Sequence, residues 1–230
     1  MPAPSYVHGA SSTPLLGETI GENLRRTVER VGDHEAVVSR QQGYRATYGE
    51  LWDLAGKVAR GLMARGVQKG DRVGIWAPNR YEWIGVQYGT ARMGAILVNI
   101  NPAYKTAELE YALNQSGVSF LILAQAFRTA DYAGMLAEVK GRCPELREAL
   151  VLESGWEALL RDADEVSETH LAEREAGRGK NGYGTWTPHT LDLVLRQETP
   201  RIGLWLDTSA MTVEETVAAI LARGNETSLA

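Results

Sequence analysis

The chain has 230 residues, of which 44% are hydrophobic and 23% are charged, and its formal net charge is −5. This composition is typical of a globular protein and argues against an extended disordered chain. The acidic balance excludes the strongly basic surface with which proteins bind nucleic acid. The longest apolar runs, such as residues 94–100 and 118–124, are strand-sized and far shorter than the roughly 20 residues that span a bilayer.

The N-terminal residues do not predict export, and the cysteine and histidines do not predict a metal site. Residues 1–13 lack the basic start and apolar core of a secretion signal, so we expect a cytoplasmic protein. The single Cys143 cannot form an intramolecular disulfide and has no evident partner base, so we interpret it as structural. The histidines lack metal-ligand spacing, and we expect them at the surface: His8, His34, His170 and His189.

Helical and strand patterns begin near residue 16. Thr47 and Glu50 form a capping box, and apolar residues at i, i+3, i+4 and i+7 follow it as far as Gly66. Before this helix we expect a peripheral helix over residues 16–30 and a small hairpin formed by residues 35–38 and 45–48.

After Gly66 the patterns alternate regularly. The predicted strands are residues 72–76, 95–100, 118–123 and 149–152, and the predicted helices are residues 79–93, 106–116 and 130–142. Strands separated by helices of this length are expected to lie parallel in one sheet with helices on both faces. The sequence therefore predicts an α/β fold with a doubly wound, mostly parallel sheet.

The end of the chain has its own pattern. Residues 201–209 are strand-like, and Thr212 with Glu215 caps a short helix that Gly224 ends. We expect a short C-terminal strand-helix unit here. The predicted organisation is a flexible N-terminus (1–15), the α/β domain (16–175), a linker or loop (176–200) and the strand-helix tail (201–224).

Several blocks of the α/β region, in their order and spacing, resemble the beginning of AMP-forming acyl-CoA synthetases. The blocks are residues 44–51, 66–75, 77–79, 94–104 and 108–113. The last two are similar to the fatty-acid branch of that family in particular. The resemblance covers residues 16–175, about two thirds of the chain, and implies the N-terminal subdomain of the synthetase fold.

The resemblance also implies a chemistry. In the complete family, ATP with Mg²⁺ and a carboxylic acid give an acyl-adenylate and pyrophosphate, and coenzyme A then displaces AMP to form a thioester. The family uses a Ser/Thr/Gly-rich phosphate loop ending in Pro-Lys-Gly, a Thr-Glu pair, a ribose-binding Asp and a C-terminal Lys. None of these motifs occurs in this sequence. We therefore assign no catalytic, cofactor-binding or metal residue, and no cofactor to this chain alone.

Where the phosphate loop is expected, shortly after Glu173, the chain has a glycine cluster instead. Gly179-Lys180 could suggest a phosphate cradle, but Arg174 and Asn181 stand where a Walker A loop needs Gly and Ser or Thr. We interpret the cluster as a linker and place a join between unrelated sequences near Ala176.

Residues 178–223 bear a weaker resemblance to the C-terminal end of a P-loop small-molecule kinase or phosphotransferase. The strand that ends at Asp207 and Ser209, followed by a short helix, carries this resemblance. No Walker A loop occurs in the chain, so we interpret Asp207 and Ser209 as a helix-entry turn.

The only candidate pocket residues are Asn101, Pro102 and Tyr104, which follow what we expect to be a central strand. Parallel α/β sheets bind ligands beyond the carboxyl ends of their strands. The alternative is a turn made by Asn-Pro.

Three functions remain open. The first is the N-terminal part of a fatty-acyl-CoA synthetase, which as a 230-residue chain does not catalyse. The second is a regulatory half-domain that pairs with a full-length synthetase or with itself. The third is a small-molecule kinase fusion. For all three we expect no nucleic acid and no membrane span, and fatty acid, coenzyme A and ATP only in a completed enzyme.

Overall fold

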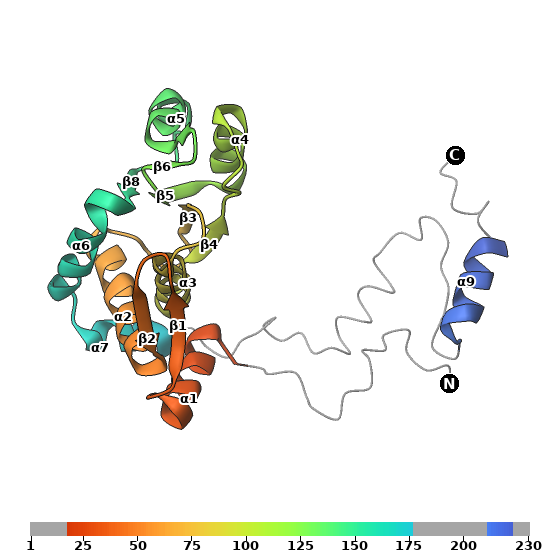
Figure 1. Ribbon diagram of the computed structural model, residues 1–230, viewed down its shortest axis with the longest axis horizontal. Helices are drawn as coiled ribbons and strands as arrows, with labels where there is room; N and C mark the ends of the chain where they lie inside the picture. The colour runs from red at the N-terminus through yellow and green to blue at the C-terminus, as the bar shows by residue number, and fades with distance from the viewer. Residues whose placement is uncertain (1–17, 177–210, 223–230) are drawn as a thin grey trace. The chain divides into compact units, whose positions relative to one another are not determined.

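A computed structural model describes residues 18–176 and residues 211–222 of the protein (Figure 1). The two parts belong to separate compact units and are described separately. Most of the predicted linker and the predicted strand over residues 201–209 lie outside the described residues, so both stay predictions. No helix within the described ranges is long and apolar enough to cross a membrane.

The N-terminal elements match the sequence patterns. They are α1 (Ile20–Val31), β1 (Glu35–Ser39), β2 (Tyr44–Thr47) and α2 (Tyr48–Ala64). β1 and β2 pair antiparallel, which confirms the hairpin. The capping box is also confirmed, because Thr47 Oγ1 accepts from Glu50 N at 3.2 Å and Glu50 Oε2 accepts from Thr47 N at 2.8 Å.

Four parallel strands form the central sheet. They are β3 (Arg72–Trp76), β4 (Ile96–Asn99), β5 (Val118–Leu123) and β8 (Glu148–Val151), in the spatial order β4-β3-β5-β8. The prediction that residues 95–100 form a central strand is wrong, because β4 pairs only with β3 and lies at the edge of the described sheet. β3 lies between β4 and β5, because the chain crosses over β3 as it passes from β4 to β5.

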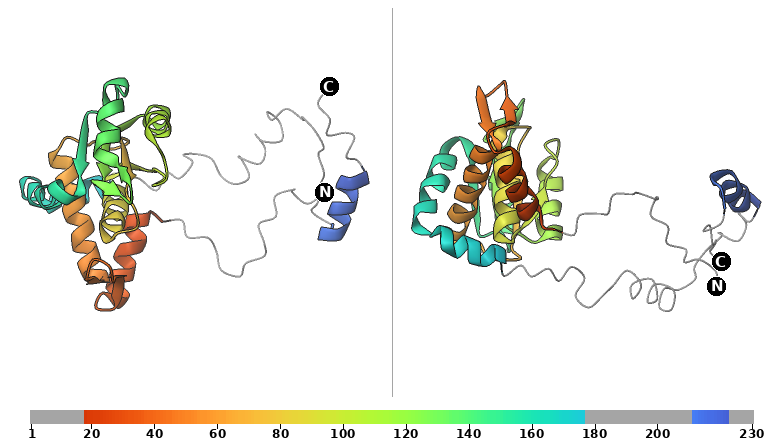
Figure 2. Two further views of the ribbon diagram at one scale, coloured as in Figure 1. Left: turned by 45° about the horizontal axis from the view of Figure 1, so that its top comes forward. Right: turned by 90° about the horizontal axis from the view of Figure 1, so that it is seen from below.

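Helices cover both faces of this sheet, as predicted. α2, α3 (Tyr81–Met93) and α6 (Leu152–Asp162) lie on one face, and α4 (Thr106–Ser116) and α5 (Tyr132–Val139) lie on the other (Figures 1 and 2). Short elements complete this unit: β6 (Ala126–Phe127), β7 (Ala130–Asp131), 3₁₀ turns at Lys140–Arg142 and Ala163–Glu165, and α7 (Glu168–Ala176). The sequence patterns did not predict α6 and α7.

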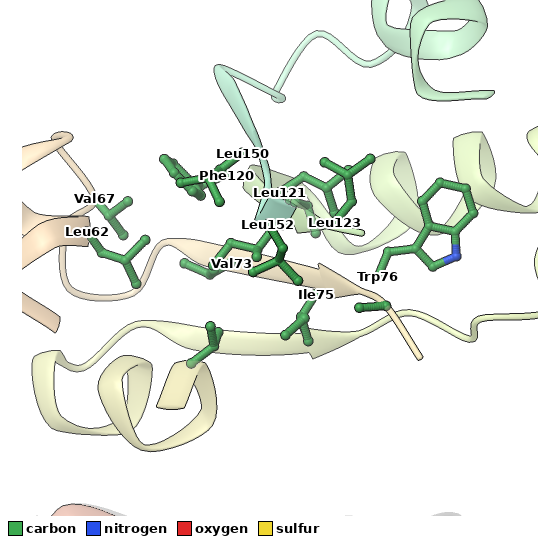
Figure 3. Close-up of a cluster of buried hydrophobic side chains, with 14 of the residues drawn as sticks. Leu62, Val67, Val73, Ile75, Trp76, Phe120, Leu121, Leu123, Leu150 and Leu152 are labelled. Atoms are coloured by element: carbon green, nitrogen blue, oxygen red, sulfur yellow. The ribbon is translucent and has the colours of Figure 1, made fainter. Parts of the chain in front are cut away.

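The core lies between the sheet and its helices. Figure 3 shows Val73, Ile75, Phe120 and Leu121 with their neighbours in a continuous apolar cluster. Val73, Ile75 and Leu121 have no exposed surface. Each buried aliphatic side chain of this size contributes about 1.5–3 kcal/mol relative to the exposed state, so this cluster is the main source of stability.

Two glycines allow α2 to approach its neighbours closely. A Cβ atom added to Gly89 of α3 would lie 2.9 Å from Val58 Cβ, and one added to Gly61 of α2 would collide with the backbone carbonyl oxygen of Leu159 in α6. The second contact is with backbone, which cannot rotate away. The spacing between α2 and α6 therefore requires glycine at position 61.

The second unit contributes one described helix, α9 (Val213–Ala222). Thr212 and Glu215 form the predicted capping box, with Glu215 N donating to Thr212 Oγ1 at 3.2 Å and Thr212 N donating to Glu215 Oε2 at 2.8 Å. Val217 and Leu221 are exposed at 49% and 76% within this unit. The helix of the predicted tail is thus confirmed.

We expect Gly61→Ala to lower the free energy of unfolding by about 1–3 kcal/mol, because the added methyl group pushes α6 away from α2. Gly141→Ala is the matched control, because a Cβ atom there meets nothing within 4 Å. Urea unfolding of both variants gives the comparison. Equal stability of the two variants would show that α2 and α6 do not pack at this distance.

Candidate functional site

The carboxyl ends of the four parallel strands meet at one edge of the sheet. The chain leaves β3 toward α3 on one face and leaves β5 toward α5 on the other. A crevice between two strands whose connections diverge in this way is the usual ligand-binding place of an open α/β sheet. We therefore take the loops after β3, β4 and β5 as the candidate site.

Aromatic rings fill one side of this edge. The Trp76 and Tyr132 rings stack with centroids 3.8 Å apart and an interplanar angle of 13°, and both side chains are fully buried. Trp76 Nε1 donates to the carbonyl oxygen of Asn101 at 3.1 Å, and the Tyr132 hydroxyl donates to that of Pro102 at 2.5 Å. Burial raises the pKa of Tyr132, so its hydroxyl keeps the proton that it donates.

The three residues predicted to line a pocket form a turn on this stack. Asn101 Oδ1 accepts from Ala103 N at 2.9 Å, and the Asn101 carbonyl accepts from Tyr104 N at 3.0 Å. Asn101 is exposed, whereas Tyr104 is half-buried and packs against the main core. The turn-forming role of Asn101 and Pro102 is thus present, and a ligand contact by these residues stays a prediction.

Ion pairs hold the other side of the edge. Arg80, which follows β3, binds Glu82 at 2.6 Å and Glu153, which follows β8, at 2.5 Å. Glu153 also accepts from the backbone nitrogen of Gln125, which follows β5, at 2.7 Å. One arginine and one glutamate thereby connect the loops after three strands. The sequence patterns did not identify this network, because Glu153 and Gln125 are far from Arg80 along the chain.

Glu82 is a charged residue that is 4% exposed. Burial raises the pKa of its carboxyl group, but hydrogen bonds from Arg80 and Gln42 outweigh burial and lower the pKa below its ordinary value of 4.5. Glu82 is therefore ionised at neutral pH, and Arg80 compensates its charge.

A cavity of about 490 Å³ opens beside this network, between the hairpin and the start of α3. Its walls include Val37 and Arg40 of the hairpin region and Asn79, Tyr81 and Trp83 of the α3 region. The size is that of a small-molecule pocket.

The start of α3 is already satisfied by side chains of the same chain. The amide of Tyr81 donates to Gln42 Oε1 at 2.8 Å, and Gln42 Nε2 donates to Glu82 Oε2 at 2.8 Å. With the Glu82 carboxylate in the first turn, the helix end has its negative partner. This arrangement does not offer a phosphate group free donors.

Within the described residues, we find neither a reactive cysteine nor a metal site. Cys143 is 3% exposed, and burial is the main factor that raises the pKa of its thiol, as expected for a structural cysteine. No group of three metal-ligating side chains occurs within residues 18–176 or 211–222. His8 and His189 lie outside those ranges.

A model of the AMP-binding enzyme family matches residues 24–216. The chain belongs to this family. The match runs past Ala176 into the region that we compared with a kinase, and it gives no support to that resemblance. The predicted join near Ala176 stays a prediction.

Two individual proteins resemble this chain in sequence. The chain is 43% identical to the mitochondrial medium-chain acyl-CoA ligase ACSF2 of Danio rerio over 145 residues. These residues make up 63% of this chain and 23% of that protein. The chain is 41% identical over 135 residues to the putative acyl-CoA synthetase YngI of Bacillus subtilis, 59% of this chain and 24% of that protein. The chain thus spans about a quarter of these relatives. The cytoplasmic location stays a prediction.

Solved structures show the same fold. The N-terminal domain of FACL13 from Mycobacterium tuberculosis superimposes with a TM-score of 0.57 at 28% identity, covering 63% of this chain and 36% of that chain. A long-chain-fatty-acid-CoA ligase from Archaeoglobus fulgidus gives a TM-score of 0.61 at 24% identity, covering 71% and 33%. The α/β unit is therefore the N-terminal part of an acyl-CoA synthetase fold.

We expect Arg80→Met to lower the free energy of unfolding by about 3 kcal/mol at neutral pH, because Glu82 is left buried without its cation. The stabilisation by this pair is present above the ordinary carboxyl pKa and is lost as the pH falls through the lowered pKa of Glu82. The variant should therefore approach the parent in stability under acid conditions.

Urea unfolding at neutral and acid pH measures this difference. Arg45→Met is the control, because Arg45 and Glu35 form a pair exposed at 67% and 53%, and such pairs contribute about 0–1 kcal/mol. A loss of stability with Arg80→Met that is no larger than with Arg45→Met would contradict the role given to the buried pair.

Proposed function

We propose that the chain supplies the N-terminal part of an AMP-forming fatty-acyl-CoA ligase. The reaction of the complete enzyme would consume ATP, a fatty acid and coenzyme A and give acyl-CoA, AMP and pyrophosphate. The observation that carries this proposal is the 43% identity over 145 residues to a medium-chain acyl-CoA ligase. Medium-chain fatty acids are accordingly the proposed substrates of the complete enzyme.

We infer that the described residues do not hold ATP and Mg²⁺ by themselves. A triphosphate needs free backbone donors and a cation, and Mg²⁺ needs oxygen ligands that are not already neutralised. At the carboxyl edge, the Glu82 and Glu153 carboxylates are bound to Arg80, and the Tyr81 amide is bound to Gln42. These groups do not fit a metal-triphosphate, and we route no chemical step through them.

The role that we assign to this part of the fold is structural support at the carboxyl edge. The Trp76–Tyr132 stack and the Arg80 ion pairs hold the loops after β3, β4 and β5 in fixed positions. Rigid loops at this edge position a bound substrate at low entropic cost. The groups that act on ATP would come from the rest of the complete enzyme.

The second candidate is a non-catalytic half-domain that pairs with a full-length synthetase. Among residues 18–176 and 211–222, no strand pairs with the outer edge of β4, and Ile96 is 52% exposed. Both observations favour a protein partner at that place. A kinase function has no supporting observation and is not proposed.

A hybrid enzyme tests the first candidate. In it, the 145-residue matching segment of the Danio rerio ligase is replaced by the aligned residues of this chain. We expect ATP-dependent octanoyl-CoA formation with kcat/KM within about tenfold of the parent ligase, equivalent to about 1.4 kcal/mol. The control is the same hybrid with Gly61→Ala. It should be less stable to unfolding than the hybrid but keep the same preference among fatty acids of different chain length. A folded hybrid without ligase activity would contradict the proposal.

A further inference from the structure

Arg92, in the last turn of α3, is a buried charged residue outside the candidate site. It is 7% exposed. Its guanidinium carbon lies 3.4 Å from the centre of the Trp52 ring of α2, and its Nη1 donates to the backbone carbonyl oxygen of Trp52 at 2.9 Å. Its Nε donates to Glu175 Oε1 of α7 at 3.0 Å. One side chain therefore joins the helices α2, α3 and α7.

The start of α1 also lies against this pair. A Cβ atom added to Gly21 of α1 would lie 3.1 Å from Glu175 Oε1 and 3.4 Å from Arg92 Cγ. The first and the last helix described in the α/β unit thus meet at Arg92. Because α7 is the last of these helices, the contact fixes the place where the chain leaves the unit.

The helix α7, which lies beside α2 (Figure 1), has little apolar surface that holds it in place. It has nine residues, and isolated helices of this length are marginal in water. Leu171 is its one buried residue. Two cavities of about 300 and 560 Å³ lie beside the helix, and Trp52, Ala172 and Glu175 line both of them. The attachment of α7 therefore depends on one apolar side chain and on polar contacts.

The two ion pairs of α7 differ in their burial. Arg60 binds Glu168 at 2.9 Å, but the Glu168 side chain is 86% exposed. Water and salt weaken a pair in such a position. The Arg92 and Glu175 side chains are 8% and 25% exposed. The second pair is therefore the one that loss of a charge should affect most.

The place of Glu175 along α7 also points to a contact outside the helix. Glu175 lies in the last turn, where the helix dipole disfavours a carboxylate and favours a cation. The neighbouring Arg174 meets that preference, and its Nη2 also donates to Gln68 Oε1 at 2.7 Å. Glu175 thus does not stabilise α7 as an isolated helix. Its carboxylate is held at this end of the helix by Arg92.

We propose that Arg92 is a clasp for α7, and that α7 opens from the α/β unit as a separate segment when the contact with Glu175 is broken. Segments with few buried apolar contacts open locally before the whole domain unfolds. Opening exposes the guanidinium of Arg92 and the ring of Trp52, while the central sheet keeps its own core. The proposal rests on contacts within the unit and is independent of the proposed ligase function.

Hydrogen exchange of the full 230-residue chain tests the proposal, read at the amides of residues 172–176 and at those of β3 and β5. Glu175→Gln keeps the size of the side chain but removes the charge that binds Arg92. The amides of α7 should then exchange at least about tenfold faster, because a buried cation has lost its partner. The amides of β3 and β5 should keep their rates, because the sheet stays folded.

Glu173→Gln is the matched control, because it removes the same charge from an exposed position of the same helix. It should leave exchange in α7 unchanged. Arg92→Lys is the second variant. Lysine keeps the charge, but its ammonium group cannot stack on Trp52 as a planar guanidinium does and bind Glu175 through two nitrogens. Exchange in α7 should therefore rise in this variant too.

Three results would overturn the proposal. Equal exchange of α7 in Glu175→Gln and in Glu173→Gln would show that Leu171 holds the helix without the clasp. A rise in Glu175→Gln that is equally large in β3 and β5 would show that α7 opens only with the whole unit. Exchange in Arg92→Lys equal to that of the parent would show that the contact between the guanidinium and Trp52 has no part in holding α7.

Discussion

The structure depends on the burial of β3. This strand pairs with β4 on one side and with β5 on the other, and helices cover both of its faces. Val73 and Ile75 consequently lose all contact with solvent. The helices are arranged about the sheet that contains this strand: α2 and α3 pack closely together on one face, and α4 and α5 lie on the other. Burial of apolar surface on both faces is what makes a parallel sheet stable.

The same strand determines what the candidate site can do. Its carboxyl end meets those of its neighbours, where open α/β sheets bind ligands. In this chain the position is occupied by a Trp-Tyr stack on one side and by an arginine with two glutamates on the other. The polar groups there bind one another. These contacts favour the proposed role of the edge as structural support, in a chain that belongs to the AMP-binding enzyme family but lacks the family's phosphate-binding motifs in its sequence.

Local signals predicted most of the fold, and non-local contacts account for what was missed. The Thr47–Glu50 capping box, the strands over residues 72–76 and 118–123 and the helix over residues 106–116 are as predicted, since each depends on short-range patterns. The edge position of β4 depends on strand order, which periodicity does not encode. The pairing of Arg80 with Glu153 joins residues 73 positions apart, so only the folded chain reveals it. For the candidate site, sequence placed Asn101, Pro102 and Tyr104 just after a strand of the parallel sheet, where the structure also has them, but it did not identify the rings and ion pairs nearby, and a ligand contact stays a prediction.

We propose that this chain has the scaffold of an acyl-CoA synthetase and does not by itself carry out the first chemical step of the family. The most direct measurement is ATP–pyrophosphate exchange by the purified 230-residue chain with octanoate and Mg²⁺, after circular dichroism has shown a cooperative thermal transition. The expected result is a folded protein with no exchange above the protein-free rate. Saturable exchange that depends on octanoate would contradict the claim, because it would show that this chain alone forms an acyl-adenylate.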